Sequence, residues 1–121
     1  MKTSDLTGSL LDYWVAKSLG WETGRLGTQS KTDPVDRGWY GDGTGDYGIS
    51  IDQFKPSQRW QTCGPLIEKY RIAIGCSGND DHWTAYIPRK EKYVLARKGE
   101  TPLIAVCRCI VASQYGDEVD A

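Results

Sequence analysis

The segment from Thr101 to Gly116 constrains the fold of this chain more than any other. Thr101 and Pro102 are typical of a helix start, because a threonine hydroxyl accepts a first-turn amide hydrogen bond and proline fits the first helical position. Residues 103–112 are nearly all apolar, and Gly116 is typical of a helix end. A helix that is apolar around most of its circumference needs other elements to cover it. We therefore predict that this helix lies at the centre of the core.

A second helix is predicted near the N-terminus, with Thr7 as its N-cap and Gly20 at its end. An amphipathic helix of this kind covers part of a core with one face. Its apolar residues have the spacing of a single helical face: Leu10, Leu11, Trp14, Val15 and Leu19.

The next stretch is rich in glycine and has no apolar periodicity. Eight of the fourteen glycines lie between Gly20 and Gly48, both included. We interpret residues 20–46 as a long irregular loop, since glycine clusters of this kind mark turns and loops. After this loop, alternation of apolar with small or polar residues predicts a short strand carrying Tyr47, Ile49 and Ile51.

The middle of the chain predicts a short helix and then a hairpin. Ser57 is the predicted N-cap of a helix from Gln58 toward Lys69. Gly64-Pro65 lies inside it, and because proline lacks a backbone donor we expect a kink or restart there. Strands are predicted at residues 70–76, 82–87 and 93–96, with a turn at 78–81 between the first two.

Together these elements predict an α+β fold class. We expect a small α/β sandwich, in which an antiparallel sheet of three to four strands packs against the N- and C-terminal helices. A length of 121 residues with 39% hydrophobic residues fits a single domain over residues 1–121. The acidic tail at 117–121 is expected to be solvated, because negative charge at a helix C-terminus is unfavourable.

Charge and composition exclude several classes of protein. Fifteen Lys and Arg against sixteen Asp and Glu give a net charge of −1, which disfavours broad nucleic-acid binding. The sequence has neither an apolar run of membrane-spanning length nor a signal peptide, so we expect no membrane contact and a cytoplasmic location. Neither zinc-site nor disulfide-framework spacing is present, so no metal and no other cofactor is expected. The four cysteines are Cys63, Cys76, Cys107 and Cys109.

The single histidine, His82, follows Asp80-Asp81, and an aspartate–histidine pair could serve a hydrolase. No serine lies in a nucleophile-elbow motif, however, and turn histidines are usually solvated. We therefore expect a protein that is not an enzyme, and a weak hydrolase using His82 stays as the catalytic alternative.

The best candidate binding site surrounds the predicted helix start at Ser57. Helix N-termini attract anions, indole rings stack on aromatic bases, and cations complement phosphate charge, so the combination predicts a site for a nucleotide-type ligand. In the alternative interpretation, the indoles are core or interface anchors and the cations are solvated. A local excess of four positive charges between Arg89 and Lys98 could add phosphate contacts if it lies nearby. The candidate residues are Lys55, Ser57, Arg59, Trp60, Arg71 and Trp83.

Several segments resemble the NinX-like family of tailed phages and prophages. They read KTSDLTG and LDYWVAK near the N-terminus, PS followed by W and GPLIE in the middle, and TPLIA and VASQYGDEV at the C-terminal end. The sequence is more distantly similar to a phage domain described as an α-β-α sandwich, which implies a compatible fold. It departs from the family pattern at Lys55, Gln58 and Arg59, where Ser, Thr and Asp are expected, so a basic junction replaces an acidic one.

The resemblance implies a phage protein that works in the cytoplasm of an infected bacterial host. We expect a non-enzymatic accessory protein of counter-defence that forms a homo-oligomer, a class assigned by analogy. It would bind and sequester a small anionic nucleotide-type immune signal, or block a host defence protein. The alternative is a protein-interaction module of phage replication or recombination, which would use its aromatic surface.

Overall fold

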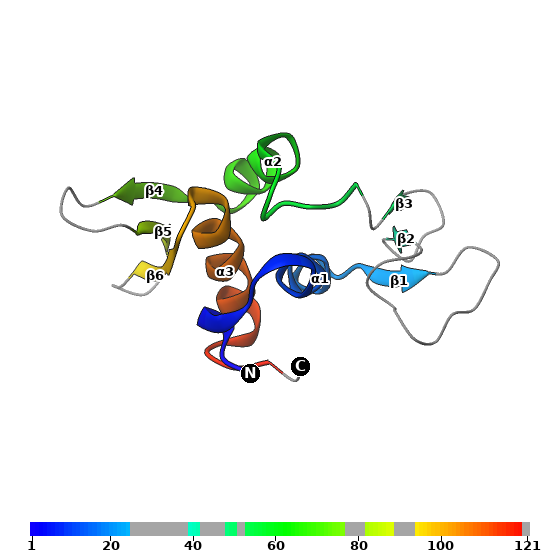
Figure 1. Ribbon diagram of the computed structural model, residues 1–121, viewed down its shortest axis with the longest axis horizontal. Helices are drawn as coiled ribbons and strands as arrows, with labels where there is room; N and C mark the ends of the chain where they lie inside the picture. Colours follow the sequence, from blue (N-terminus) through cyan, green and yellow to red (C-terminus); the bar gives the residue numbers. More distant parts are fainter. Residues whose placement is uncertain (25–38, 42–47, 51–52, 77–81, 89–93, 120–121) are drawn as a thin grey trace.

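The computed structural model describes residues 1–24, 39–41, 48–50, 53–76, 82–88 and 94–119 (Figure 1). Its mixture of helices with antiparallel strands confirms the predicted α+β class. In chain order the elements are η1 Thr3–Asp5, α1 Gly8–Ser18, β1 Glu22–Gly24, β2 Trp39–Gly41, β3 Gly48–Ser50, α2 Trp60–Tyr70, β4 Ala73–Cys76, β5 Trp83–Pro88, β6 Val94–Gly99 and α3 Pro102–Tyr115.

Helix α3 lies between the other elements, as its apolar circumference predicts (Figure 1). The sheet β4-β5-β6 packs on one side of it, and α1 and α2 contact it on others. Thr101 caps the helix as expected, because the Ile104 N–H donates to Thr101 Oγ1 at 3.2 Å. The helix ends at Gly116, whose positive φ of 77° is a backbone conformation that glycine adopts easily. Its buried residues are Leu103, Ala105, Val106, Cys107, Cys109, Ile110, Val111 and Ala112.

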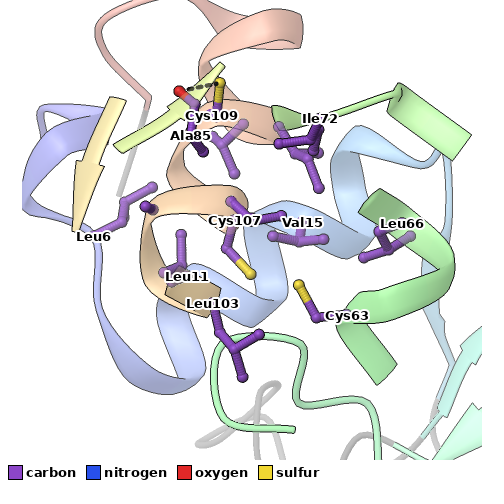
Figure 2. Packing of buried hydrophobic residues seen from close by; sticks show 14 of the residues in the cluster. Leu6, Leu11, Val15, Cys63, Leu66, Ile72, Ala85, Leu103, Cys107 and Cys109 are labelled. Atoms are coloured by element: carbon purple, nitrogen blue, oxygen red, sulfur yellow. Dashed lines mark hydrogen bonds between the residues drawn. The ribbon is translucent and has the colours of Figure 1, made fainter. Parts of the chain in front are cut away.

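The core continues from α3 into the two other long helices (Figure 2). Leu11 and Val15 of α1 and Cys63 of α2 surround Cys107 of α3, and all four side chains are completely buried. Figure 2 shows the Cys63 and Cys107 thiols directed toward each other. The three helices therefore meet at small and medium-sized side chains, which permit close approach of their backbones.

The opposite side of α3 packs on the three-stranded sheet. Cys109 is buried there, with its Sγ 3.5 Å from the carbonyl oxygens of both Ala85 in β5 and Leu95 in β6. The predicted hairpin is confirmed: β4 pairs with β5 in antiparallel register from Ala73↔Tyr86 to Cys76↔Trp83. Strand β6 follows on the other edge of β5, so the sheet order is β4-β5-β6.

Two predicted strand boundaries are wrong. Tyr70 belongs to α2 rather than to a strand, because the helix closes through Arg71, which has a φ of 54°. The Ile72 N–H then donates to the Ile67 carbonyl at 3.0 Å, which satisfies the helix end and delays the strand to Ala73. At the other edge, β6 continues to Gly99 rather than ending near residue 96.

Helix α1 confirms the predicted N-terminal helix but not its position. It packs on α3, whereas we expected both terminal helices to lie against the sheet. The reason is that α3 is apolar on several sides, so it covers the sheet with one side and offers another to α1.

The glycine-rich stretch is not irregular throughout. Strands β1 and β2 lie within it and pair with β3, in the order β1-β2-β3, to form a second small antiparallel sheet. The strand predicted from Tyr47, Ile49 and Ile51 is observed as β3, whereas positions 47 and 51 lie outside the described residues. Sequence periodicity missed β1 and β2 because such short strands depend on backbone pairing with distant partners rather than on an apolar pattern.

Helix α2 begins later than predicted and is continuous through its proline. Arg59, rather than Ser57, is the N-cap residue, and the helix extends over Trp60–Tyr70 without a restart at Pro65. Proline here removes only the hydrogen bond to the carbonyl of Gln61, a residue on the exposed side of the helix, where water can replace the lost donor.

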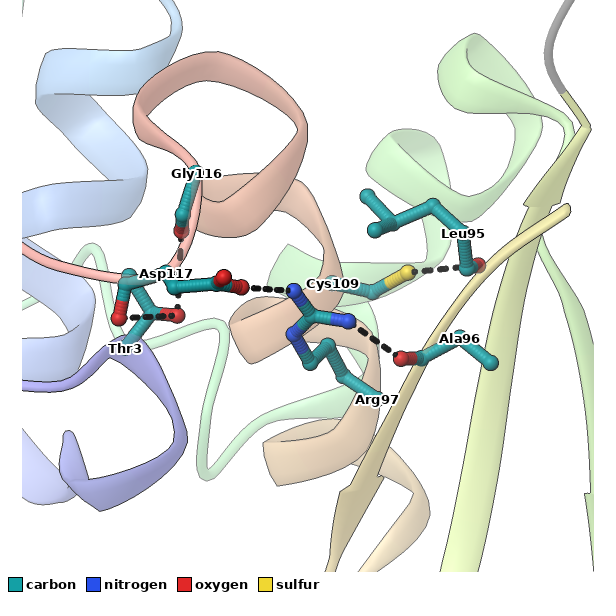
Figure 3. Close-up of polar contacts among 7 residues, drawn as sticks. All are labelled: Thr3, Leu95, Ala96, Arg97, Cys109, Gly116 and Asp117. Atoms are coloured by element: carbon teal, nitrogen blue, oxygen red, sulfur yellow. Dashed lines mark hydrogen bonds and ion pairs between the residues drawn. The ribbon is translucent and has the colours of Figure 1, made fainter. Parts of the chain in front are cut away.

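The C-terminal segment is tied to the N-terminus (Figure 3). The Thr3 N–H donates to the Asp117 carbonyl at 2.8 Å, and the Val119 N–H donates to the Met1 carbonyl at 2.9 Å. Figure 3 shows the Thr3 side chain, whose hydroxyl lies 3.1 Å from the Gly116 carbonyl oxygen and 3.3 Å from that of Asp117. The side chains of Asp117 and Glu118 are exposed, as predicted for the acidic tail, but the backbone is paired and Val119 is buried. The tail therefore closes the fold instead of leaving it.

Truncation of Ile110 tests whether α3 carries the core. Ile110 is completely buried, so Ile110→Ala should leave a cavity and lower the free energy of unfolding by about 2–5 kcal/mol. Chemical denaturation followed by circular dichroism measures this change. An unchanged unfolding midpoint would show that α3 is not part of the core.

Two glycine-to-alanine variants should have opposite effects on stability. A Cβ at Gly99 would lie 2.8 Å from the Ala105 Cα and collide with the backbone at the start of α3, so Gly99→Ala should cost about 1–3 kcal/mol. A Cβ at Gly75 in β4 would meet only the Tyr86 ring at 3.8 Å, an ordinary van der Waals contact, so Gly75→Ala should stabilise the protein by about 0.5–1 kcal/mol. Thermal melts of both variants and of the parent protein show whether each melting temperature falls or rises. Equal changes in melting temperature would contradict the close approach at Gly99.

Candidate functional site

The structure does not bring the six predicted site residues together. Lys55, Ser57, Arg59 and Trp60 are neighbours at the start of α2. Arg71 is at the other end of this 11-residue helix, roughly 16 Å away at about 1.5 Å per residue. Trp83 begins β5 and is half-buried against the core cluster. Trp83 therefore matches the alternative interpretation of a core anchor.

Ser57 has a structural contact in place of the predicted capping role. Its backbone N–H donates to Asp12 Oδ1 of α1 at 2.8 Å, and this hydrogen bond is buried. The next turn closes on Lys55, whose carbonyl accepts from the N–H groups of Gln58 and Arg59, both at 2.9 Å. The segment before α2 is thus fixed to α1, and it sets where Arg59 begins the helix.

Asp12 is an unusual anchor because it is only 3% exposed. Among the described residues, its Oδ2 atom and the Ser57 hydroxyl are buried without a hydrogen-bond partner. Burial raises the pKa of Asp12 above its usual value, and this increase is opposed by hydrogen bonding to Ser57 and by the charge of Lys55. Lys55 therefore acts on the buried carboxylate of α1.

A pocket of about 530 Å³ opens between the end of α1, the segment before α2 and one face of α2. Volumes of this size are typical of small-ligand sites. Only Arg59 of the predicted site residues lines it. The residues that give this α2 pocket its character are Leu19, Trp21, Phe54, Arg59, Thr62 and Lys69.

The α2 pocket combines aromatic rings with positive charge. The Trp21 and Phe54 rings lie 4.9 Å apart with an interplanar angle of 58°, and Phe54 is almost completely buried behind the half-buried indole. Arg59 and Lys69 are exposed cations ten residues apart, near opposite ends of α2. Such a pocket can accept a flat ring against Trp21 and an anionic group at either cation.

Three residues that line the pocket are not among the predicted site residues: Trp21, Phe54 and Lys69. Thr62 and Lys69 have helical spacing, which places them on one face, but nothing in the sequence shows that this face turns toward the end of α1. The Trp21 N–H donates to the Ala16 carbonyl at 3.0 Å, so the chain turns back at the end of α1 and brings the indole to α2.

The four cysteines and His82 are not among the residues that line the α2 pocket. All four cysteines are free, and burial, together with Cys63 and Asp12 nearby, raises the pKa of Cys107 well above its usual value, which keeps this thiol protonated. No cluster of three or more metal-ligating side chains occurs among the described residues. His82 is exposed just before β5, and its neighbours Asp80 and Asp81 lie outside the described residues.

The helices and the antiparallel strands together define a small α+β protein. The family model described as "Bacteriophage P22, NinX" matches residues 2–114. The chain belongs to this NinX family, which confirms the resemblance seen in the sequence. The match also spans the glycine-rich stretch that the resemblance did not cover. No curated protein matches the chain significantly. Among the described residues, no helix is long and apolar enough to cross a membrane.

Variants of Asp12 test the buried anchor of the segment before α2. Burial raises the pKa of Asp12 above its ordinary value of 3.8 in the folded protein. The protonated Asp12 side chain therefore contributes fully to stability below pH 3.8, and this contribution is lost as the pH rises through the raised pKa. Asp12→Asn keeps an acceptor for the Ser57 N–H without the charge. The difference in melting temperature, variant minus parent, should therefore increase from about pH 3.5 to about pH 7.

Asp12→Ala provides the matched comparison, since it leaves the buried Ser57 N–H without an acceptor. It should lower the free energy of unfolding by about 1–3 kcal/mol. A pH-independent difference for the asparagine variant would show that Asp12 titrates as a solvated carboxylate, contrary to its burial.

Proposed function

We propose that this NinX-family protein is a non-enzymatic phage accessory protein that binds a small anionic ligand of nucleotide type in the α2 pocket. In infected cells it would sequester such a molecule. A nucleotide-type immune signal of the host is the ligand that fits a counter-defence role. The cytoplasmic location and a homo-oligomeric state stay predictions.

One observation carries this proposal, namely the joint presence of the Trp21 ring and the Arg59 cation in a single pocket. A nucleotide presents an aromatic face and a phosphate, and these need a stacking surface and a positive charge at the same time. Arg59 makes no ion pair with any described residue, so its guanidinium can pair with a ligand without first breaking such a contact. The hydrogen bond from Ser57 to Asp12 holds the adjoining segment in place before the ligand arrives.

Charge-removing variants test the pocket directly. The double variant Arg59→Gln/Lys69→Gln removes both cations and keeps the helix, because both side chains are exposed. Titration calorimetry with adenosine and guanosine 5′-monophosphates and their 3′,5′-cyclic forms should show binding to the parent protein. Since a hydrogen bond to a charged group contributes about 1.5–3 kcal/mol, the variant should bind at least about tenfold more weakly.

Arg71→Gln is the matched control, since it removes one exposed cation from the same helix outside the pocket. It should leave the affinity unchanged. Native mass spectrometry of protein purified from infected cells extends the search to ligands outside this panel. If no small molecule is found and no nucleotide binds, the proposal is wrong.

A second candidate function rests on Trp60, which is 58% exposed at the start of α2. Exposed tryptophans are frequent energetic centres of protein interfaces. In this reading the protein is an interaction module that blocks a host defence protein or serves phage replication or recombination. Trp60→Ala should then abolish capture of a protein partner, whereas nucleotide binding in the α2 pocket should persist.

A further inference from the structure

A second hollow lies beside β6 and is lined by positively charged groups. It has a volume of about 430 Å³ and shares no lining residue with the α2 pocket. Among the residues given for this hollow there are two arginines, a lysine and a histidine, and no carboxylate. We call it the β6 groove, and its polar lining consists of Ser4, His82, Thr84, Arg97, Lys98 and Arg108.

Arg108 reaches this groove from α3 and is held in place by neutral acceptors. Its Nε donates to the Leu6 carbonyl at 3.0 Å and its Nη1 to the Lys98 carbonyl at 3.1 Å. A guanidinium has five N–H donors, so three are left by these two hydrogen bonds. Arg108 is half-buried, and no described carboxylate is in ion-pair contact with it. The fold therefore holds a partly desolvated cation with spare donors at a fixed position.

Arg97 lies in β6 and already holds an oxyanion (Figure 3). Its Nη1 donates to the Ala96 carbonyl at 2.7 Å, and its Nη2 pairs with Asp117 Oδ1 at 2.6 Å. The Asp117 side chain is 87% exposed, whereas that of Arg97 is only 23% exposed. Exposed ion pairs of this kind contribute little, so a stronger anion can replace the carboxylate.

Hydroxyl and ammonium groups complete the polar lining. Thr84 in β5 and Lys98 in β6 are directly opposite each other in the sheet register, so their side chains share one face. Lys98 is exposed, and Ser4 of η1 adds a second hydroxyl. Two fixed guanidinium groups, a flexible ammonium group and neutral hydroxyl donors match the several oxygens of a phosphate group.

We propose that the β6 groove binds the phosphate group of a small soluble molecule, and that Asp117 occupies Arg97 when no ligand is present. Arg97, Lys98 and Arg108 supply the charge, and Thr84 supplies a hydroxyl donor. This site is independent of the α2 pocket, because the two pockets lie at different elements and share no lining residue. Asp117 then acts as an internal competitor that the incoming phosphate displaces.

The competitor makes the proposal testable by a gain of affinity. Binding of inorganic phosphate and of glycerol 3-phosphate is followed by ¹H–¹⁵N NMR at constant ionic strength, with chloride as the balancing ion. The backbone amides of Thr84 and Lys98 should shift and saturate. Asp117→Asn removes the competing charge and should tighten binding about two- to fivefold. Glu118→Gln is the matched control, since it removes the neighbouring exposed charge and should change the affinity less.

Lys98→Gln tests the corresponding loss of affinity. This side chain is exposed, so it can be changed without disturbing the core. Its affinity for phosphate should fall at least about fivefold. Tighter binding of the ester than of inorganic phosphate would support a phosphorylated metabolite, and equal binding would support free phosphate as the ligand.

Three results would overturn the proposal. Shifts that increase linearly without saturation would show only a salt effect. If the parent, the Asp117→Asn and the Lys98→Gln proteins bound phosphate with equal affinity, phosphate would not bind in the β6 groove. Saturable shifts confined to amides around Arg59 and Lys69 would place the phosphate in the α2 pocket, which would leave the nucleotide proposal intact.

Discussion

Helix α3 is apolar around most of its circumference, so it is stable only when several elements cover it at once. The sheet β4-β5-β6, α1 and α2 each take one part of that surface. Complete burial of a leucine, isoleucine or valine side chain contributes about 1.5–3 kcal/mol, and α3 alone buries Leu103, Val106, Ile110 and Val111. The arrangement of the remaining elements is therefore a consequence of covering this helix.

Both candidate sites lie where covering elements meet. The α2 pocket forms where the end of α1 approaches α2, and the β6 groove forms where η1, β6 and α3 converge. Each site has a buried or half-buried polar contact that fixes its wall. In the first, the Ser57 N–H donates to Asp12, and in the second, Arg108 is bound to the Leu6 and Lys98 carbonyls. Both proposed sites thus depend on polar contacts between elements rather than on a sequence motif.

The binding site expected from the sequence stays a prediction, and only one of its six residues, Arg59, lines the α2 pocket. Cations and indoles were expected around the start of α2, and Arg59 does line a pocket with an indole. That indole is Trp21, however, rather than Trp60 or Trp83. The basic run ending at Lys98 is evident in the sequence as a charged segment. Arg108, which lines the same groove, is the single cation in the largely apolar sequence of α3, and nothing in the sequence marks it as a site residue. No spacing along the chain relates these two positions, since they meet only when β6 and α3 pack.

The sequence by itself determined the elements whose signals are local. The cap at Thr101, the apolar run of α3 and the hairpin of β4 and β5 each depend on residues within a few positions of one another, so short-range hydrogen bonding and periodicity suffice to predict them. Only the tertiary structure decided that α1 covers α3 instead of the sheet and that β1, β2 and β3 pair with one another. It also decided that Ser57 binds Asp12, 45 residues away, rather than capping a helix. These arrangements are decided by differences in free energy between alternative long-range contacts. Such differences depend on packing and desolvation, which no local sequence pattern contains.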